Sequence, residues 1–343
     1  MFCSVRAAAG HAKGTRLMGP RFRAAALAAL IGLAGCRGNG AAGSLSERES
    51  PNKPSQVRIG YQKSSVLVLV KWRGLLAKAL GARGVTIQWA EFPTGPAVIE
   101  AINADQLDLG FVGEAPPIFG QATSEALVYL ATEPPAPRSE AIVVKNGSAI
   151  RGLQDLKGKT IAFNKGSNVQ YLVAQALQHA GLRYEDVKAV FLAPADARAA
   201  FESGTVDAWA VWDPYLASAE VGFDAHVIAN AEGLAKNYLF YVGRRELAEQ
   251  NPVLTHDILD QIAATDVWVS GHLDETASYL APLLGIDPRA MSLSVHRATW
   301  GVLPIDDQIV ASQQRIADTF LELGLLSKPL RVSDALPKIR VHW

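Results

Sequence analysis

The sequence predicts an α/β fold with mixed, mostly parallel sheets that are divided between two lobes. Four times along the chain, a short apolar strand leads through a polar turn into a helical stretch. Strands that alternate with helices form parallel sheets, and ligands of such sheets bind beyond the carboxyl ends of the strands. With 343 residues, of which 49% are hydrophobic, the chain can bury one large core or two medium ones.

The charge balance argues against nucleic acid as a partner. The chain holds 33 Lys and Arg residues against 33 Asp and Glu residues, so its formal net charge is zero. The basic residues are scattered, and none of their runs is long enough to follow a phosphate backbone.

The N-terminal residues 1–36 have the order of a secretory signal peptide. The segment Met18–Arg23 carries two arginines, and an apolar run from Ala24 to Ala34 follows it. About eleven apolar residues are too few to span a bilayer permanently. The closing tetrapeptide Leu33-Ala34-Gly35-Cys36 resembles a bacterial lipobox, which implies that Cys36 carries a lipid. We expect Met18 to be the true start, because the signal is complete from there.

Cysteine usage fits an exported protein. Cys3 and Cys36 are the only cysteines, so the chain has no disulfide after processing at Cys36. Residues 37–55, rich in Gly, Ala, Ser, Asn and Pro, are expected to form a flexible tether. These features place the protein in the periplasm or at the outer face of the cytoplasmic membrane, anchored through its lipid.

The four strand–turn–helix units follow in order along the chain. Their strands are Val57–Tyr61, Leu107–Val112, Thr160–Phe163 and Val206–Val211. The turns after these strands are Gln62–Ser65, Gly113–Pro117, Asn164–Asn168 and Trp212–Tyr215.

The sequence predicts two segments in which the chain crosses from one lobe to the other. Glu133–Pro137 is rich in proline and therefore extended, and near Tyr241–Arg245 a strand gives way to a polar stretch. We therefore expect lobe 1 to contain residues 56–135 and 246–343, and lobe 2 to contain residues 138–245. A ligand cleft between the lobes would draw two turns from each.

The third unit is the best candidate for an anion site. The N–H groups in the first turn of a helix have no partners within the helix, and the helix dipole adds positive charge there. Gly166, Ser167 and Asn168 stand at that point and can hold a small oxyanion. The alternative is that Ser167 or Asn168 only caps the helix.

A series of short motifs follows in fixed order along the chain. It comprises Tyr61-Gln62-Lys63, Glu91 to Pro96, Asp108-Leu109-Gly110, Gly113 to Phe119, Glu133-Pro134-Pro135, Lys165-Gly166-Ser167, Pro194 to Phe201 and Trp209 to Tyr215. With these motifs the chain resembles, from about residue 56 to residue 330, the substrate-binding proteins of aliphatic sulfonate ABC importers. The resemblance implies a periplasmic binding protein of the second type, which closes on an organic sulfonate and delivers it to a membrane permease for sulfur acquisition.

The resemblance also implies the ligand-contacting residues. They are Gln62, Gly113, Glu114, Gly166, Ser167, Asn168, Trp212 and Asp213. A sulfonate only accepts hydrogen bonds, so we expect Glu114 and Asp213 to be tied to backbone N–H groups or to the opposite lobe. Trp212 offers a flat wall for an organic tail, although it can also be a core residue, and Asp213 can serve only as a helix cap.

Other functions remain open. Receptors for taurine, nitrate or another small anion share the expected fold, and so does an enzyme that makes the pyrimidine of thiamine. We expect no enzyme, because the seven histidines form no HxxH or HExxH pair and no GxSxG motif occurs. We also expect no cofactor or metal, and a monomer.

Overall fold

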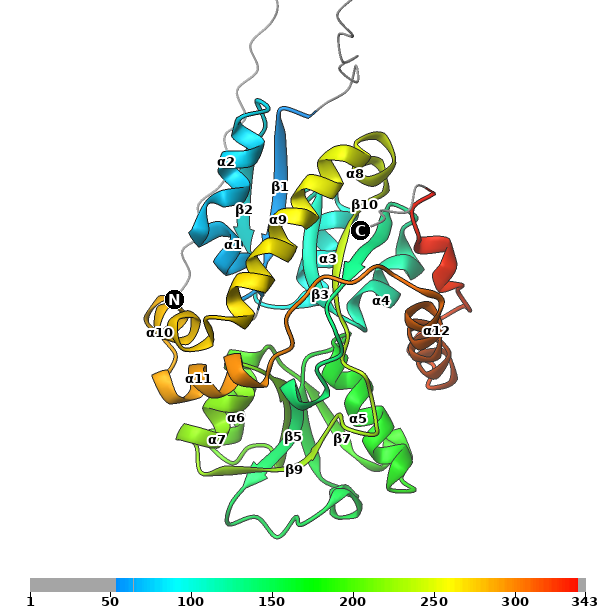
Figure 1. The fold of residues 1–343 in the computed structure, drawn as a ribbon. Helices are drawn as coiled ribbons and strands as arrows, with labels where there is room; N and C mark the ends of the chain where they lie inside the picture. The colour runs from blue at the N-terminus through cyan, green and yellow to red at the C-terminus, as the bar shows by residue number, and fades with distance from the viewer. Residues whose placement is uncertain (1–53, 64, 339–343) are drawn as a thin grey trace, which may run out of the picture. The chain divides into compact units, whose positions relative to one another are not determined.

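Two five-stranded sheets form the framework of the protein, one in each lobe (Figure 1). The computed structural model describes residues 54–63 and 65–338. The predicted signal peptide with Met18 and Cys36, and the tether up to residue 53, lie outside the described residues.

The first sheet has the strand order β2-β1-β3-β10-β4. Its strands are β1 (Gln56–Tyr61), β2 (Thr86–Glu91), β3 (Leu109–Gly113), β4 (Leu127–Thr132) and β10 (Leu239–Arg244). β2, β1 and β3 pair in parallel, whereas β10 is antiparallel to both of its neighbours. Four strands therefore point one way and β10 is reversed, as expected for a mixed, mostly parallel sheet.

The second sheet repeats this pattern with the strand order β7-β6-β8-β5-β9. Its strands are β5 (Glu140–Lys145), β6 (Thr160–Phe163), β7 (Lys188–Phe191), β8 (Ala208–Trp212) and β9 (Ala225–Asn230). Here β5 is the reversed strand. The strands of all four predicted units are present, as β1, β3, β6 and β8.

Helices cover both faces of each sheet (Figure 1). One face of the first sheet packs against α1, α2, α9 and α10, and the other against α3, α4 and α12. The second sheet lies between α5 on one face and α6 and α7 on the other. The helices are α1 (Leu67–Arg73), α2 (Leu75–Gly81), α3 (Gly95–Asn103), α4 (Pro116–Thr123), α5 (Asn168–His179), α6 (Pro194–Glu202), α7 (Tyr215–Gly222), α8 (Arg245–Gln250), α9 (Pro252–Ser270), α10 (Leu273–Leu284), α11 (Pro288–Arg297) and α12 (Asp307–Glu322), with single turns η1 (Pro137–Ser139), η2 (Leu153–Leu156), η3 (Tyr184–Asp186) and η4 (Val332–Ala335).

Two crossovers join the lobes. The first, residues 133–139, leads from β4 to β5, and the second, residues 231–238, leads from β9 to β10. They run side by side, because the Glu133 N–H donates to the Leu239 carbonyl at 2.8 Å and the Ala136 N–H donates to the Asn237 carbonyl at 3.2 Å.

The predicted end of lobe 2 at residue 245 is wrong. Residues 239–244 form β10 in the middle of the first sheet, so the chain returns to lobe 1 before residue 239. In β10, Tyr241 packs into the core on one face while Phe240 and Val242 pack into the core on the other. The strand is therefore apolar on both sides, and this pattern would suit the centre of either sheet.

The C-terminal helices do not all stay on lobe 1, where the sequence placed residues 246–343. Helix α11 packs against α7 of lobe 2 (Figure 1), and its Arg297 pairs with Glu220 at 2.5 Å. On the other side of the molecule, Phe320 of α12 meets Tyr171 of α5 edge-on, with ring centroids 5.9 Å apart. Elements from the end of the chain thus contact both lobes.

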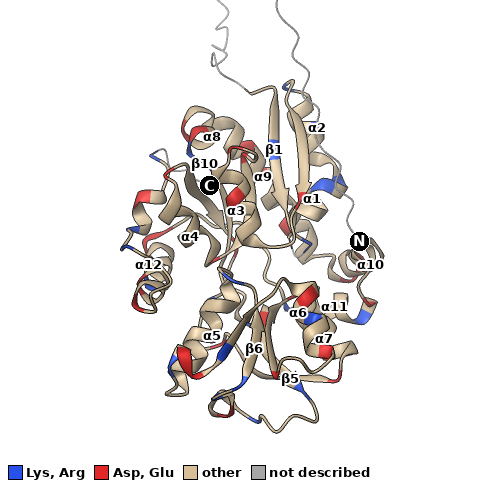
Figure 2. Ribbon diagram, turned by 180° about the vertical axis from the view of Figure 1, so that it is seen from behind, with Lys and Arg blue, Asp and Glu red and all other residues tan. Residues whose placement is uncertain are grey.

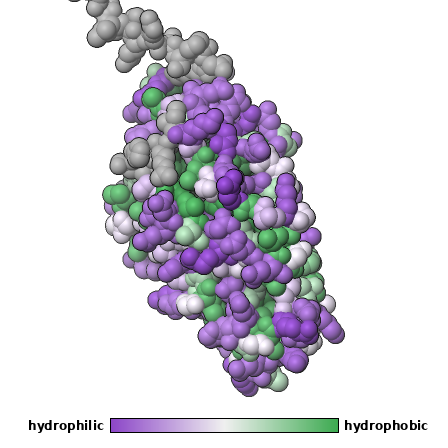
Figure 3. Space-filling model, turned by 90° about the vertical axis from the view of Figure 1, so that its right-hand side faces the viewer, coloured by the Kyte–Doolittle hydropathy of each residue, from purple (hydrophilic) through white to green (hydrophobic). Residues whose placement is uncertain are grey.

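Charged and apolar surface residues are interspersed. Figure 2 shows Lys and Arg spread among Asp and Glu over both lobes. On the face in Figure 3, hydrophilic residues surround smaller groups of hydrophobic ones. None of the helices in the described ranges combines the length and the apolar character needed to cross a membrane.

Candidate ligand-binding pocket

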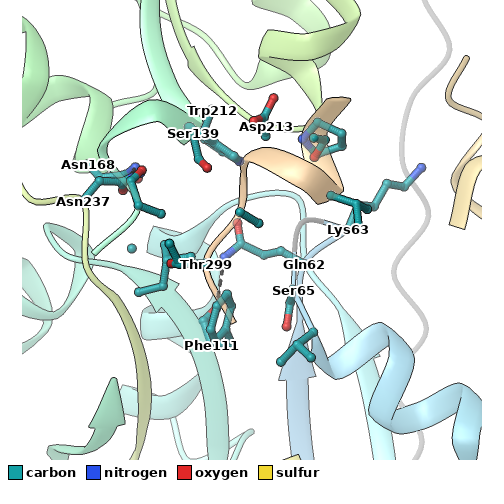
Figure 4. A pocket seen from close by; sticks show the side chains of 18 of the residues that line it. Gln62, Lys63, Ser65, Phe111, Ser139, Asn168, Trp212, Asp213, Asn237 and Thr299 are labelled. Atoms are coloured by element: carbon teal, nitrogen blue, oxygen red, sulfur yellow. Dashed lines mark hydrogen bonds between the residues drawn. The ribbon is translucent and has the colours of Figure 1, made fainter. Parts of the chain in front are cut away.

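A pocket lies between the two lobes, where the predicted turns meet (Figure 4). Its cavity volume is about 80 Å³, which is room for several water molecules or a small organic group. Lobe 1, η1 of the first crossover, lobe 2 and the C-terminal helices all contribute side chains. Its polar lining includes Gln62, Lys63, Ser65, Ser139, Ser167, Asn168, Asp213, Asn237, Ser294 and Thr299, and its apolar lining includes Val66, Leu69, Phe111, Trp212, Leu239, Leu280, Met291, Val295 and Trp300.

Helices of both lobes begin at the pocket, and they include α3 and α4 of lobe 1 and α5 and α7 of lobe 2. Gly95 and Pro116 are the first residues of α3 and α4, and Asn168 is the first residue of α5. Pro214, which also lines the pocket, directly precedes α7. A helix N-terminus carries partial positive charge, so the four ends together favour an anion.

The start of α5 retains free backbone donors. The Ser167 hydroxyl donates to the Asn164 carbonyl at 2.6 Å, so it does not cap the helix. The Gly166 N–H donates to the Gln170 side chain at 2.6 Å, and the Ser167 N–H donates to the Asn164 carbonyl at 3.4 Å. Within the described residues, the N–H groups of Asn168 and Val169 have no acceptor. Of these two residues only Asn168 lines the pocket, so its N–H, rather than those of Gly166 and Ser167, can bind an oxyanion there.

The side chain of Asn168 is hydrogen-bonded to β5 of lobe 2 and to the second crossover instead of remaining free for a ligand. Its Nδ2 donates to the buried carboxyl of Glu140 in β5 and, at 3.0 Å, to Oδ1 of Asn237 in the second crossover. Gly113 of lobe 1 lies directly against it, since a Cβ on Gly113 would be 2.6 Å from Asn168 Oδ1. A glycine at position 113 therefore permits the two lobes to approach here.

Glu114 and Gly166 are the two predicted site residues that do not line the pocket. Gly166 has a φ of 72° and forms the turn before α5, where it faces Phe119 of α4. Glu114 is fully buried, and its Oε2 accepts a hydrogen bond from the Tyr238 N–H at 3.0 Å. Burial raises the pKa of Glu114 to about 7, although the N–H groups of Tyr238 and Asn237 oppose the rise. The predicted tie of Glu114 to a backbone N–H is confirmed.

Asp213 is held in the same way. Its Oδ1 accepts from the Ala217 N–H in the first turn of α7 at 3.0 Å, and its Oδ2 lies 3.6 Å from Arg297 Nε. Burial raises the pKa of Asp213 to about 7, and the charge of Arg297 works against this rise. Asp213 thus caps α7, as one of the two interpretations expected, and it also lines the pocket.

Gln62 and Trp212 both line the pocket, as predicted. The Gln62 amide donates to the Phe111 carbonyl at 3.0 Å, so only part of its donor capacity remains for a ligand (Figure 4). Trp212 is half-buried and meets Tyr215 edge-on, with ring centroids 6.4 Å apart. Trp209, three residues earlier on β8, is buried in the lobe 2 core.

Sequence reasoning missed Ser139 and the pocket residues near the C-terminus. Ser139 is 8% exposed, and its hydroxyl has no hydrogen-bond partner among the described residues. It lies two residues after the proline-rich segment Glu133–Pro137 that the sequence marked as a crossover, which is the signal that could have identified it. Figure 4 shows it on the pocket wall beside Trp212. Thr299 is tied to the crossover, because its hydroxyl donates to the Pro134 carbonyl at 2.7 Å.

The lining suits reversible binding of a neutral or anionic molecule. Its described residues include no histidine or cysteine, and the described part of the chain holds no cluster of three or more His, Cys, Asp or Glu side chains that could bind a metal ion. Lys63 extends away from the other labelled side chains (Figure 4).

Comparison with known proteins places this architecture in a family. Residues 64–251 match the family model described as the periplasmic phosphonate-binding protein of an ABC transporter. A protein of Escherichia coli K12 named for binding aliphatic sulfonates is 38% identical over 287 residues, which are 83% of this chain and 89% of that protein. A protein of Bacillus subtilis 168 with the same name is 31% identical over 312 residues, 90% of this chain and 92% of that protein.

A solved structure agrees with these sequence matches. The alkanesulfonate-binding protein SsuA of Xanthomonas axonopodis pv. citri, bound to MOPS, is 36% identical and superposes with a TM-score of 0.80. The match covers 83% of this chain and 99% of that one. The chain therefore belongs to the family of periplasmic substrate-binding proteins of ABC transporters.

Proposed function

We propose that the protein binds organic sulfonates in the pocket between its lobes and delivers them to the permease of an ABC importer for sulfur acquisition. The observation that carries this proposal is the meeting of four helix N-termini, two from each lobe, in a pocket whose remaining lining is largely apolar. Such a pocket matches a molecule with an anionic head and an apolar body. The names of the two relatives and the MOPS complex support the same ligand class.

The sulfonate head would be held by uncharged donors. The free N–H group of Asn168 and the unpartnered hydroxyl of Ser139 are suited to it. A sulfonate is fully ionised and accepts hydrogen bonds only, so every contact to its head must come from a donor. The helix N-termini supply positive potential without a buried cation.

Ligand binding would favour the closed arrangement of the lobes. A ligand held by α3 and α4 of lobe 1 and by α5 and α7 of lobe 2 has more contacts when the lobes are together. Binding therefore shifts the population toward the closed state, which a permease can distinguish from the open one.

A phosphonate is the second candidate, because the matched family model carries that ligand in its description. The protonation state separates the two ligands. A phosphonate changes charge near neutral pH, whereas a sulfonate does not. Near the pocket, Asp213 and Glu114 have pKa values of about 7, so above that pH they add negative charge, which repels a dianion more strongly than a monoanion.

Calorimetry with a matched pair of ligands tests the proposal. Propanesulfonate and propylphosphonate share one tail, and the purified protein is titrated with each at pH 6 and pH 8. We expect the sulfonate to bind more tightly at both pH values. Tighter binding of the phosphonate or of nitrate in the same assay would contradict the assignment to organic sulfonates, and tighter binding of taurine, an aminosulfonate, would contradict a preference for simple alkanesulfonates.

We further propose that the protein is a receptor and not an enzyme. The lining lacks the histidine or cysteine on which nucleophilic and acid–base chemistry usually relies. The bound sulfonate should therefore be recovered unchanged after long incubation with the protein, as checked by mass spectrometry. We also expect a monomer in light scattering.

The lipid anchor at Cys36 is part of the proposal. Its support is the Leu33-Ala34-Gly35-Cys36 tetrapeptide, which follows an apolar run. Replacing Cys36 by Ser should move the protein from the membrane fraction to the soluble envelope fraction and abolish lipid labelling, as measured by fractionation and radiolabelled fatty acid. Ser44→Ala, downstream of Cys36 in the tether, is the matched control and should leave both unchanged. Normal labelling of the Cys36→Ser variant would exclude the anchor.

A further inference from the structure

The pocket has two ends that are built by different parts of the chain. Helix α5 and the hairpin of α10 and α11 lie on opposite sides of the region between the sheets (Figures 1 and 2). At the α5 end is the free N–H group of Asn168. At the other end, Leu280 of α10 and Met291 and Val295 of α11 line the pocket together with Leu69 of α1.

The end at α10 and α11 is largely apolar and tightly packed, although Ser294 of α11 also lines it. Leu69, Leu280, Met291 and Val295 are between 1% and 7% exposed and belong to one core cluster of lobe 1. Met291 and Val295 are four residues apart on α11, so they share the face that is turned to the pocket. Trp300 closes this end, and its ring is fixed by a hydrogen bond from Nε1 to the Val295 carbonyl at 3.3 Å.

The match to the family model divides the pocket in a similar way. Residues 64–251 include Ser139 and Asn168, which carry the donors suited to an anionic head, and also Leu69 of the apolar end. The hairpin and Trp300 follow residue 251 and lie outside that match. The segment shared with a family described for phosphonates thus ends before the hairpin, which supplies most of the apolar wall.

We propose that the α10–α11 hairpin forms a tail subsite that selects sulfonates by the size of their apolar tail, with Met291 at the wall that limits tail length. This inference rests on the proposed function, because it assigns the ligand's tail once the head lies at α5. Methionine suits such a wall, since its unbranched thioether adapts to neighbouring groups of different shape. Each methylene that becomes buried raises affinity by up to about fourfold.

A chain-length series tests the subsite. The purified protein is titrated with methanesulfonate, butanesulfonate, hexanesulfonate and octanesulfonate by calorimetry. For the parent, affinity should rise with tail length, by up to about fourfold per methylene, and then level off where the tail meets Met291. Met291→Ala opens space at that wall, so the rise should continue to longer tails while methanesulfonate binding changes less than twofold. Val295→Ala, a smaller change on the same face, should shift the series in the same direction.

The controls separate this inference from the proposed function. Leu293→Ala changes an exposed residue of α11 outside this pocket and should leave the series as in the parent. Thermal unfolding shows whether Met291→Ala folds. If it does not, the chain-length series of Val295→Ala tests the subsite in its place. If the parent binds sulfonates but the variants keep its length optimum, the tail lies elsewhere and only the subsite is refuted. If the parent binds no sulfonate, the proposed function fails and the subsite fails with it.

Discussion

At Gly113, lobe 1 lies directly against Asn168 of lobe 2. A Cβ at this position would lie 2.6 Å from Oδ1 and 3.2 Å from Cβ of Asn168. Asn168 cannot easily move away, because it is buried and held by Glu140 and Asn237. We therefore predict that Gly113→Ala weakens ligand binding at least tenfold and destabilises the protein by about 1–3 kcal/mol, the usual range for overpacking.

Calorimetry and urea unfolding measure these two effects. Gly147→Ala is the matched control, because a Cβ there meets nothing within 4 Å. An unchanged affinity and stability of Gly113→Ala would mean that the contact between Gly113 and Asn168 does not limit closure.

The sequence predicted where the pocket residues lie better than what their side chains do. A polar turn after an apolar strand places a residue at the carboxyl end of that strand, and this rule located Gln62, Gly113, Asn168 and Asp213. Whether a side chain is free depends on partners from distant segments. Asn168 is occupied by residues 28 and 69 positions away, and no local pattern reveals this. Ser139 was missed because its position in the pocket depends on how the crossover packs between the lobes.

At the scale of elements, the reversed strands β5 and β10 were the least predictable part of the fold. Each pairs with neighbours from two other parts of the chain and is buried on both faces. A short apolar strand of this kind carries no signal for its direction or its sheet. The sequence located the crossover before β5 through its prolines, whereas residues 231–238 before β10 contain no proline and were not recognised.

The placement of β10 has a consequence for lobe movement. Because β4 and β10 are neighbours in the first sheet, the crossovers that leave and enter them run side by side and share hydrogen bonds. Movement of one lobe against the other must pass through this paired segment. Ser139 and Asn237 belong to the crossovers and also line the pocket. A movement of the lobes therefore changes the positions of these two residues in the pocket.

At the scale of the whole molecule, buried carboxyl groups gather around the paired crossovers. Glu114 and Glu140 interact with each other, and burial is the main cause of the raised pKa of both. Glu133 and Asp266 form a second interacting pair, in which Glu133 accepts a hydrogen bond from the Tyr241 hydroxyl at 2.8 Å. Burial raises the pKa of Asp266 to about 7 and that of Glu133 well above its ordinary value. Hydrophobic surroundings thus favour the protonated form of these groups.

This arrangement predicts a stability that falls as the pH rises from 5 to 8. In the unfolded chain, Glu114 loses its proton near its ordinary pKa of 4.5, whereas in the folded protein it keeps the proton up to about 7. Between these values the folded state binds more protons, so raising the pH favours unfolding. The stabilisation is complete below about 4.5 and is lost once the pH exceeds about 7. Each unit of pKa difference corresponds to about 1.4 kcal/mol, and Asp213 and Asp266 act in the same direction.

Urea unfolding at pH 5, 6, 7 and 8 measures this dependence, and Glu114→Gln identifies one of its sources. Glutamine keeps the shape of glutamate and can accept from the Tyr238 N–H, but it does not ionise. The variant should therefore lose on the order of 2 kcal/mol less stability than the parent between pH 5 and pH 8. Glu322→Gln, at an exposed position at the end of α12, is the matched control and should follow the parent. A stability that rises with pH in the parent, or an equal fall in Glu114→Gln, would show that Glu114 is not held in its protonated form at the crossovers.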